Sequence, residues 1–260
     1  MKILAYAKVN LTLDILGVRE DGYHELSSIV LPIELNDTIE IIKRNDSLVT
    51  SNLGYKDDLC IKAYQALKSY KPSSLMSGVD INVDKKIPVG GGLGGGSADA
   101  AAVLRLLNQM FNLGCSPEEL AQVAAFVGSD VPALVLAQHY RSAVLMRGRG
   151  ELVECISRPS ELPNKDVYLV NPRVHSSTKL VFQNYKNKPS FGPNKLENAA
   201  IDLYPKIGEA LEFLKGAGAE MARMSGSGAT VFGFANNLSI PNGVEYDIIR
   251  TKLLCDCPVV

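Results

Sequence analysis

The chain has 260 residues, enough for one large domain or two of ordinary size. Its formal net charge of −1 gives no bulk attraction to nucleic acid or to an acidic membrane, so we expect neither as a partner. The sequence contains no unbroken run of about 18 apolar residues, so we expect no transmembrane helix. The odd number of irregularly spaced cysteines, five, indicates reduced thiols and a cytoplasmic protein.

The N-terminal region is predicted to be rich in strands. Residues 5–13 alternate between apolar and polar side chains, which is the pattern of a half-buried strand. The Asp-Gly pair inside EDGYHE indicates a hairpin or a tight turn. Residues 26–35 and 37–42 are interpreted as two further strands. We therefore expect an antiparallel sheet near the start of the chain.

Helices are predicted to follow. Residues 60–70 have helical spacing, and an alternating strand over residues 79–83 precedes a glycine-rich run. A broad apolar face predicts a helix from about Ser97 to Met110. The segment SPEEL then carries the capping-box pattern of another helix start, with proline at the first helical position.

The composition changes to glycine, proline and charge over residues 147–165, where we place a domain boundary. The expected domains are residues 1–155 and 156–260. The second domain is interpreted as a strand, a helix, one long helix over residues 196–216 and a strand over residues 229–235. The small-residue loop MSGSGA lies between that long helix and the last of these strands, and a tight helix-to-strand turn is compatible with it.

The segment PVGGGLGGGS raises the main functional question, because so much glycine is entropically costly unless bare backbone is needed. A flexible linker would have polar flanks, whereas here a patterned strand and helix flank the run. The G-x-G-x-x-G match is formal only, because the preceding strand alternates and no strand ending in an acidic residue follows. A Walker A loop would need lysine where Gly96 stands. The remaining interpretation of the glycine run is a phosphate cradle, made of backbone amides at a helix N-terminus.

This glycine run resembles the ATP-binding loop of the GHMP kinase superfamily. Three further stretches, AKVNLTLDILGVREDGYHEL, GSDVP and MSGSGATVF, are similar to one branch of it, in the same order along the chain. The resemblance implies an α+β, two-domain GHMP kinase fold. Its N-terminal ribosomal-S5-like α/β domain and C-terminal ferredoxin-like α/β domain would enclose the active site in the cleft between them.

The resemblance also implies a reaction. The protein would phosphorylate an alcohol on a small cytidine diphosphate sugar-alcohol substrate, using ATP and Mg²⁺. Asp130 would accept the proton of the acceptor hydroxyl and Lys8 would orient Asp130. The local pattern alone leaves a solvated strand face open for Lys8 and Asn10, and an N-cap open for Asp130. Ser97 is predicted as a ligand of Mg²⁺ shared with ATP, and the role of helix N-cap is also open to it.

Two aromatic residues, Tyr23 and Phe182, would hold the cytosine between them, and His24 would bind its edge. Read locally, Tyr23 and His24 are also compatible with an ordinary hairpin. The family has an Asn-Leu pair where Asp58-Leu59 stands here, so the side chain that would contact the nucleotide on the adenine side is different. The full implied sets are Lys85, Pro88, Gly90, Gly91, Gly92, Leu93, Gly94, Gly95, Gly96, Ser97, Ala98, Asp58 and Leu59 for ATP, and Asn10, Tyr23, His24, Thr178, Phe182, Ser225 and Gly226 for the acceptor.

Two other functions compete with this one. A mevalonate or homoserine kinase would share the superfamily fold, but such enzymes lack the DGYHE hairpin. A non-catalytic binding module would have no reason to keep Lys8, Ser97 and Asp130 together. The sequence leaves both a monomer and a weak dimer open.

Overall fold

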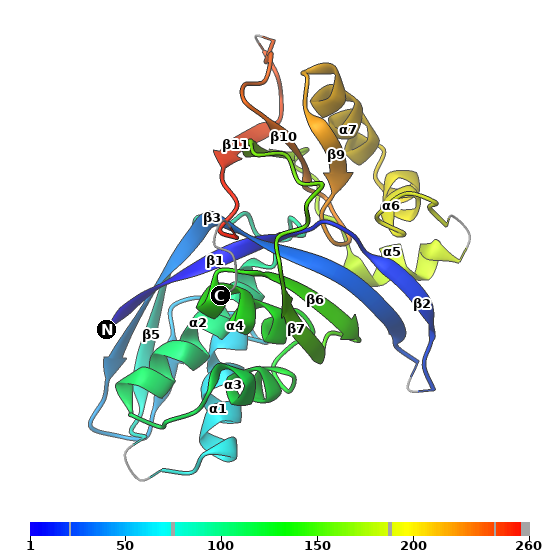
Figure 1. Ribbon diagram of the computed structural model, residues 1–260. Coiled ribbons are helices and arrows are strands. Elements are labelled where there is room, and N and C mark those ends of the chain that lie inside the picture. Colours follow the sequence, from blue (N-terminus) through cyan, green and yellow to red (C-terminus); the bar gives the residue numbers. More distant parts are fainter. Residues whose placement is uncertain (21, 74–75, 187–188, 242, 256–260) are drawn as a thin grey trace.

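The computed structural model describes residues 1–20, 22–73, 76–186, 189–241 and 243–255, and it contains two sheets (Figure 1). Asp21 of the predicted Asp-Gly turn lies outside the described residues. The first sheet has seven strands in the order β4-β5-β3-β6-β7, with β1 and β2 also paired to β3. Their bounds are β1 Lys2–Asn10, β2 Asp14–Val18, β3 His24–Lys43, β4 Val49–Ser51, β5 Val79–Asp84, β6 Ala143–Gly148 and β7 Leu152–Ile156.

Strand β1 confirms the predicted alternation, because its small and apolar side chains Ala5, Ala7 and Val9 are fully buried. The polar side chains of Lys8 and Asn10 are buried as well, so the solvated face left open for them is wrong. Both are almost inaccessible to water, since the glycine loop and the MSGSGA segment cover this end of β1. The strand therefore carries two polar groups into the interior of the protein.

The two strands predicted over residues 26–35 and 37–42 form one 20-residue strand, β3. The polar pair Asn36-Asp37 suggested a break, but both residues pair with β1 and so continue the ladder. Beyond its hairpin with β2, β3 also pairs with β5 and β6. These interstrand hydrogen bonds outweigh the local preference of asparagine and aspartate for turns.

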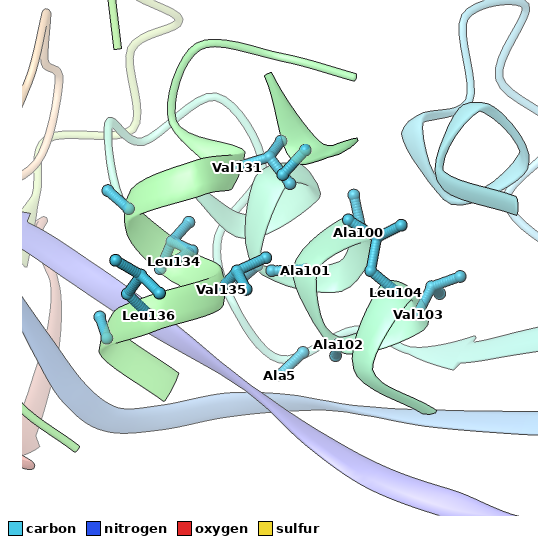
Figure 2. Close-up of a cluster of buried hydrophobic side chains, with 14 of the residues drawn as sticks. Ala5, Ala100, Ala101, Ala102, Val103, Leu104, Val131, Leu134, Val135 and Leu136 are labelled. Carbon is cyan, nitrogen blue, oxygen red and sulfur yellow. The ribbon is translucent and has the colours of Figure 1, made fainter. Parts of the chain in front are cut away.

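Four helices cover one face of this sheet: α1 Leu59–Tyr70, α2 Gly95–Met110, α3 Pro117–Ala124 and α4 Val131–Tyr140. The predicted capping box at the start of α3 is confirmed. Alanines on α2 let it approach both the sheet and α4 closely, and Figure 2 shows Val135 of α4 facing Ala101 of α2, with Ala5 of β1 beneath. This packing fixes the N-terminal ends of α2 and α4, where the candidate site lies.

The second sheet has the order β11-β8-β10-β9, all antiparallel. This is the β-α-β-β order of a ferredoxin-like unit, but residues 236–241 and 243–246 contain no helix between β10 and β11. The second crossover helix is thus missing from the described part of that connection. The bounds are β8 Asp166–Asn171, α5 Thr178–Tyr185, α6 Glu197–Leu203, α7 Lys206–Gly216, β9 Glu220–Met224, β10 Val231–Ala235 and β11 Asp247–Thr251.

Two predictions in this half are wrong. The single helix over residues 196–216 is interrupted, because Tyr204 precedes Pro205 and takes a non-helical conformation (φ −135°, ψ 78°). The loop MSGSGA joins two strands rather than a helix and a strand, because β9 intervenes. Strand β9 is short and only its last residue is fully buried, so it has little alternation to reveal it.

The two halves share a core. Helices α5 to α7 cover one face of the second sheet, whereas Phe232 and Phe234 on the other face join the core of the first sheet. The chain end also returns to the first sheet, where the amide of Leu254 donates to the carbonyl of Pro32 at 2.9 Å. We still propose domains of residues 1–155 and 156–260, a boundary that falls at the last residue of β7, next to the connection over residues 157–165. No helix in the described residues is long and apolar enough to cross a membrane.

Candidate active site

A cleft of about 910 Å³ is lined by residues from both halves of the chain. Its walls come from β1, the hairpin of β2 and β3, the glycine loop, the starts of α1 and α4, and the inner face of α5. All the predicted site residues line it except Ala98 and Ser225, which are fully buried behind its wall. Segments far apart in the sequence therefore converge on one cavity.

The glycine loop has an alternating conformation that requires glycine. Gly90, Gly92 and Gly94 all have positive φ values, of 72°, 74° and 69°. A Cβ on Gly92 would lie 2.3 Å from the carbonyl oxygen of Ser225, so the loop is pressed against the MSGSGA segment. Helix α2 begins at Gly95 rather than at the predicted Ser97, because Gly94 occupies the N-cap position in the left-handed conformation.

Ser97 is accordingly not the N-cap of α2, and the N-cap function left open for it is wrong. No side chain caps this helix, so its first amides have no side-chain partner at the cap. Ser97 lines the cleft from the first turn. Backbone amides without a side-chain cap, at the positive end of a 16-residue helix, are suited to binding an anion.

Lys8 and Asp130 meet in the cleft. The Lys8 Nζ atom donates to Asn10 Oδ1 at 2.5 Å and to the carbonyl oxygen of Gly92 at 2.9 Å, and lies 3.5 Å from Asp130 Oδ2. The Lys8 side chain is 3% exposed, whereas that of Asp130 is 36% exposed. Asp130 occupies the N-cap position of α4, but its side chain makes no capping hydrogen bond. Its carboxylate is thus available to the cleft and faces a buried ammonium.

A buried polar network holds Asn10 in place behind this pair. The Asn10 amide donates to Ser28 Oγ at 2.8 Å, and Ser28 Oγ donates to the carbonyl of Thr12 at 2.6 Å. Ser225 Oγ accepts from the Asn10 backbone amide at 3.3 Å and donates to the carbonyl of Gly92 at 2.9 Å. Ser28 escaped the sequence analysis, because a serine in an apolar strand carries no distinctive spacing. Every buried polar atom named here has a partner, which makes the arrangement rigid.

The aromatic residues lie at the other end of the cleft, in an arrangement that differs from a simple sandwich. The ring of His24, rather than Tyr23, packs on Phe182, with ring centroids 5.0 Å apart. Tyr23 is 56% exposed, and the guanidinium carbon of Arg149 lies 5.5 Å from its ring centroid. Thr178 Oγ1 is 2.8 Å from Ser227 Oγ, which ties α5 to the MSGSGA loop.

Electrostatics at this end favour a neutral imidazole. Burial lowers the pKa of His24 below 6.5, and the positive charge of Lys186 lowers it further. Lys179, Lys186 and Arg149 also line the cleft and were missed by the sequence analysis. Basic residues on a helix surface or in a turn look like ordinary solvated charges, so only the folded arrangement reveals them.

The predicted adenine-side residues both have partners within the protein. Asp58 caps α1, since its Oδ1 accepts from the amide of Cys60 at 2.8 Å, and its Oδ2 is buried without a hydrogen-bond partner. Lys85 lines the cleft and contacts two buried carboxylates, Asp37 and Asp99. Burial raises the pKa of Asp99 to about 7, and the ammonium of Lys85 offsets this only in part.

Known proteins are similar to this chain over most of its length. The models for the GHMP kinases N terminal domain and the GHMP kinases C terminal domain match residues 58–138 and 176–248. Proteins called 4-diphosphocytidyl-2-C-methyl-D-erythritol kinase from Bacillus cytotoxicus and Bacillus anthracis are each 37% identical to it over 277 residues. These alignments cover 94% of this chain and 93% of each relative.

Solved structures agree. A crystal structure of 4-(cytidine 5'-diphospho)-2C-methyl-D-erythritol kinase has a TM-score of 0.74 at 30% identity, and the match covers 90% of both chains. A homoserine kinase from Cytophaga hutchinsonii also has a TM-score of 0.74 but only 15% identity, with 97% of this chain and 94% of that one covered, and so shows the fold alone. The family models, these relatives and the glycine loop at the start of α2 lead to one conclusion: the chain belongs to the GHMP kinase family.

Proposed function

We propose that the protein transfers the γ-phosphoryl group of ATP to the 2-hydroxyl of 4-diphosphocytidyl-2-C-methyl-D-erythritol. The products would be the 2-phosphate and ADP, in the non-mevalonate route to isoprenoid precursors. The observation that carries the proposal is the Lys8–Asp130 pair, 3.5 Å apart, in the same cleft as the glycine loop and the His24–Phe182 ring pair. The names of the 37% identical relatives supply the acceptor.

The glycine loop and the start of α2 would hold the ATP phosphates. Backbone amides offer partial positive charge without a flexible side chain, and phosphoryl transfer depends mainly on such positioning. Mg²⁺ usually keeps several waters and binds through substrate phosphates and one or two protein oxygens. Among the described residues no cluster of three or more metal-ligating side chains exists, and Ser97 offers a single hydroxyl in the first turn of α2. These residues fit a Mg²⁺ that arrives with ATP, which Ser97 would help to hold while the metal neutralises phosphate charge.

Asp130 would accept the proton of the acceptor hydroxyl. Two of the three Lys8 donors are used by neutral acceptors, Asn10 and the Gly92 carbonyl, so its positive charge is not cancelled by them. That charge faces Asp130, where it attracts and orients the carboxylate. The hydroxyl would then lie between Asp130 and the γ-phosphate, which the glycine loop presents from the other side.

The acceptor base would bind at the aromatic end. Tyr23 and Phe182 offer flat faces to a cytosine, and the imidazole of His24 offers a hydrogen bond to its edge. Thr178 and Gly226 also line the cleft and would contact the acceptor. A small-molecule substrate rather than a macromolecule suits a cleft of this size. The cytoplasmic location, the absence of nucleic-acid and membrane partners, and the choice between monomer and weak dimer stay predictions.

The test is an assay that couples ADP release to a spectroscopic signal. The purified protein is mixed with ATP and Mg²⁺, with or without the cytidine substrate, and parallel reactions contain mevalonate or homoserine. We expect ADP release only with the cytidine substrate, together with phosphorus NMR signals of its 2-phosphate. Equal or faster turnover of mevalonate or homoserine would contradict the proposal.

A further inference from the structure

Three charged side chains lie together beneath the glycine loop, apart from the Lys8–Asp130 pair. The Lys85 Nζ atom lies 2.5 Å from Asp37 Oδ2 and 2.7 Å from Asp99 Oδ2. The side chains of Asp37 and Asp99 are 0% and 1% exposed, and that of Lys85 is 21% exposed. A buried ion pair costs desolvation energy, so such a group calls for a reason beyond stability.

The three residues belong to the two ends of the loop. Asp37 in β3 accepts, through Oδ1, from the amides of Lys86 at 2.5 Å and Ile87 at 2.8 Å, where the chain enters the loop. Asp99 is the fifth residue of α2, where the chain has just left the loop. Lys85 joins the two carboxylates. The entrance and the exit of residues 88–94 are therefore connected through one ammonium group.

Packing at the start of α2 supports the same view. A Cβ placed on Gly95 would lie 3.3 Å from Lys85 Nζ, so the ammonium rests against the first residue of the helix. Positive charge is unfavourable at a helix N-terminus, unless carboxylates compensate it. Here two carboxylates do so, which leaves little of the Lys85 charge for a further anion.

The loop itself has few means to hold its shape. Its glycines have no side chains, and glycine loses the most conformational freedom on ordering. A cradle whose amides already point at the phosphates binds more tightly than one that must be ordered by the ligand. Fixing the two ends of the loop at a constant separation is a direct way to achieve this.

We propose that Lys85 is a positioning residue which, with Asp37 and Asp99, clamps the two ends of the glycine loop and so preorganises its amides for the ATP phosphates. The proposal rests on the proposed kinase function of the cleft. It assigns Lys85 a different task from direct neutralisation of the nucleotide, although Lys85 lines the cleft. Asp37 and Asp99 become parts of the nucleotide site without touching the nucleotide.

Asp99→Asn distinguishes a clamping Lys85 from a Lys85 that binds the phosphates directly, because the two predict opposite changes in ATP affinity. The comparison is made at pH 8, where Asp99, with a pKa of about 7, is mostly ionised. The asparagine keeps an oxygen for Lys85 but removes a compensating charge. If Lys85 bound the phosphates directly, the freed charge would strengthen ATP binding. The clamp predicts weaker ATP binding, by about tenfold, the scale of weakening one charge-assisted hydrogen bond. The kcat at saturating ATP and the KM for the acceptor stay near the unsubstituted values, because neither depends on loop ordering once ATP is bound.

The dissociation constant of a non-hydrolysable ATP analogue is measured by calorimetry, and steady-state kinetics give kcat and both KM values. Asp84→Asn is the matched control, since Asp84 is an exposed aspartate next to Lys85 in the chain but outside the clamp. We expect a change of less than about twofold for it, as for an exposed charge. Unchanged or tighter binding in Asp99→Asn, or equal weakening in both variants, would overturn the clamp.

Lys85→Arg provides a second measurement if Asp99→Asn does not fold. A guanidinium has donors enough to bridge two carboxylates, so the analogue should bind within about threefold of the unsubstituted protein. A loss of tenfold or more in folded Lys85→Arg, checked by circular dichroism, would overturn the proposal. Calorimetry with the ATP analogue needs no acceptor, so it tests the clamp alone, whereas acceptor-dependent ADP release tests the proposed kinase function. Either proposal can therefore be contradicted while the other stands.

Discussion

At the scale of single residues, the cleft contains two kinds of side chain: some are buried and held in place, and others are open to the cavity. Lys8 and Asn10 are buried and held by hydrogen bonds, whereas Asp130 and Tyr23 face the cavity. A buried lysine is normally expensive, so its presence beside a carboxylate that caps nothing points to chemistry. Three residues lend themselves to direct tests of this division.

Asp130→Asn should lower turnover at least about a hundredfold, the scale of a general base, with ATP binding nearly intact. The asparagine keeps the shape of the side chain but accepts no proton. Stopped-time assays of ADP release and calorimetry with ATP measure the two effects separately. Turnover like that of the unsubstituted protein would remove Asp130 from the mechanism.

Tyr23→Ala should raise the KM for the cytidine substrate and leave the KM for ATP unchanged. Stacking of a base on an aromatic ring contributes about 1–3 kcal/mol, so kcat/KM for the acceptor should fall roughly 5- to 150-fold. Tyr140→Ala is the control, because Tyr140 is an exposed tyrosine outside the cleft. An effect of Tyr23→Ala on ATP saturation alone would place the hairpin in the nucleotide site.

Acceptor binding should weaken as the pH falls through the pKa of His24. Burial keeps this pKa below 6.5, so the imidazole is neutral at pH 7 and becomes charged only in more acidic solution. The charged form would face Lys186 and lose its hydrogen-bond acceptor. The KM for the acceptor, measured from pH 5 to pH 8, should rise at the acidic end in the unsubstituted protein and stay flatter in His24→Gln. Identical pH profiles would exclude His24 from acceptor binding.

At the scale of elements, the glycine loop, β1 and the MSGSGA segment form one unit. The Lys8 amide donates to the carbonyl of Leu93 at 3.1 Å, and the Thr230 amide donates to the carbonyl of Gly91 at 3.1 Å. The loop therefore lies between a strand of the first sheet and the β9–β10 connection of the second. The sequence revealed the loop and its helix, but contacts between segments this far apart in the chain have no local signal.

Gly94→Val should abolish measurable ATP binding while the fold persists. The left-handed φ of 69° disfavours a β-branched residue, and the new side chain would press on Lys8, whose Cε would lie 3.0 Å from the added Cβ. Calorimetry with ATP and thermal unfolding are the measurements. Gly216→Ala in α7 is the control, because nothing lies within 4 Å of the added Cβ. Unchanged ATP affinity in Gly94→Val would place the phosphate cradle elsewhere.

At the scale of the whole molecule, the two sheets share one core, although each half has its own helices. Phe232 of β10 is fully buried and belongs to the core of the first sheet. Because apolar contacts cross between the halves, we expect the cleft to stay assembled without a ligand. The shared core also predicts how the protein unfolds.

Phe232→Ala should lower the free energy of unfolding by about 3–5 kcal/mol, the usual cost of removing a buried phenylalanine. Thermal unfolding should stay a single transition when followed both by circular dichroism and by calorimetry, because both halves lose the same core. Phe191→Ala is the control, since Phe191 is 94% exposed. Two separate transitions in the unsubstituted protein would show that the halves are independent.

The sequence by itself determined the elements whose pattern is local. The alternation of β1, the capping box of α3 and the glycine run before α2 each follow from side chains near one another in the chain. The motifs also determined the family, because their residue types and order resemble the GHMP kinases, to which the comparisons assign the chain.

Tertiary structure decided the rest. Only the fold joined two expected strands into β3 and placed β9 before the MSGSGA loop. The helix break before Pro205, in contrast, has a local cause in the sequence, because a proline disfavours the helical conformation of the residue before it. The fold alone buried Lys8, turned Asp130 away from capping and brought Asp37, Lys85 and Asp99 together. The physical reason is that burial, pairing between strands and the charge around a group depend on neighbours distant in the chain, which no local pattern encodes.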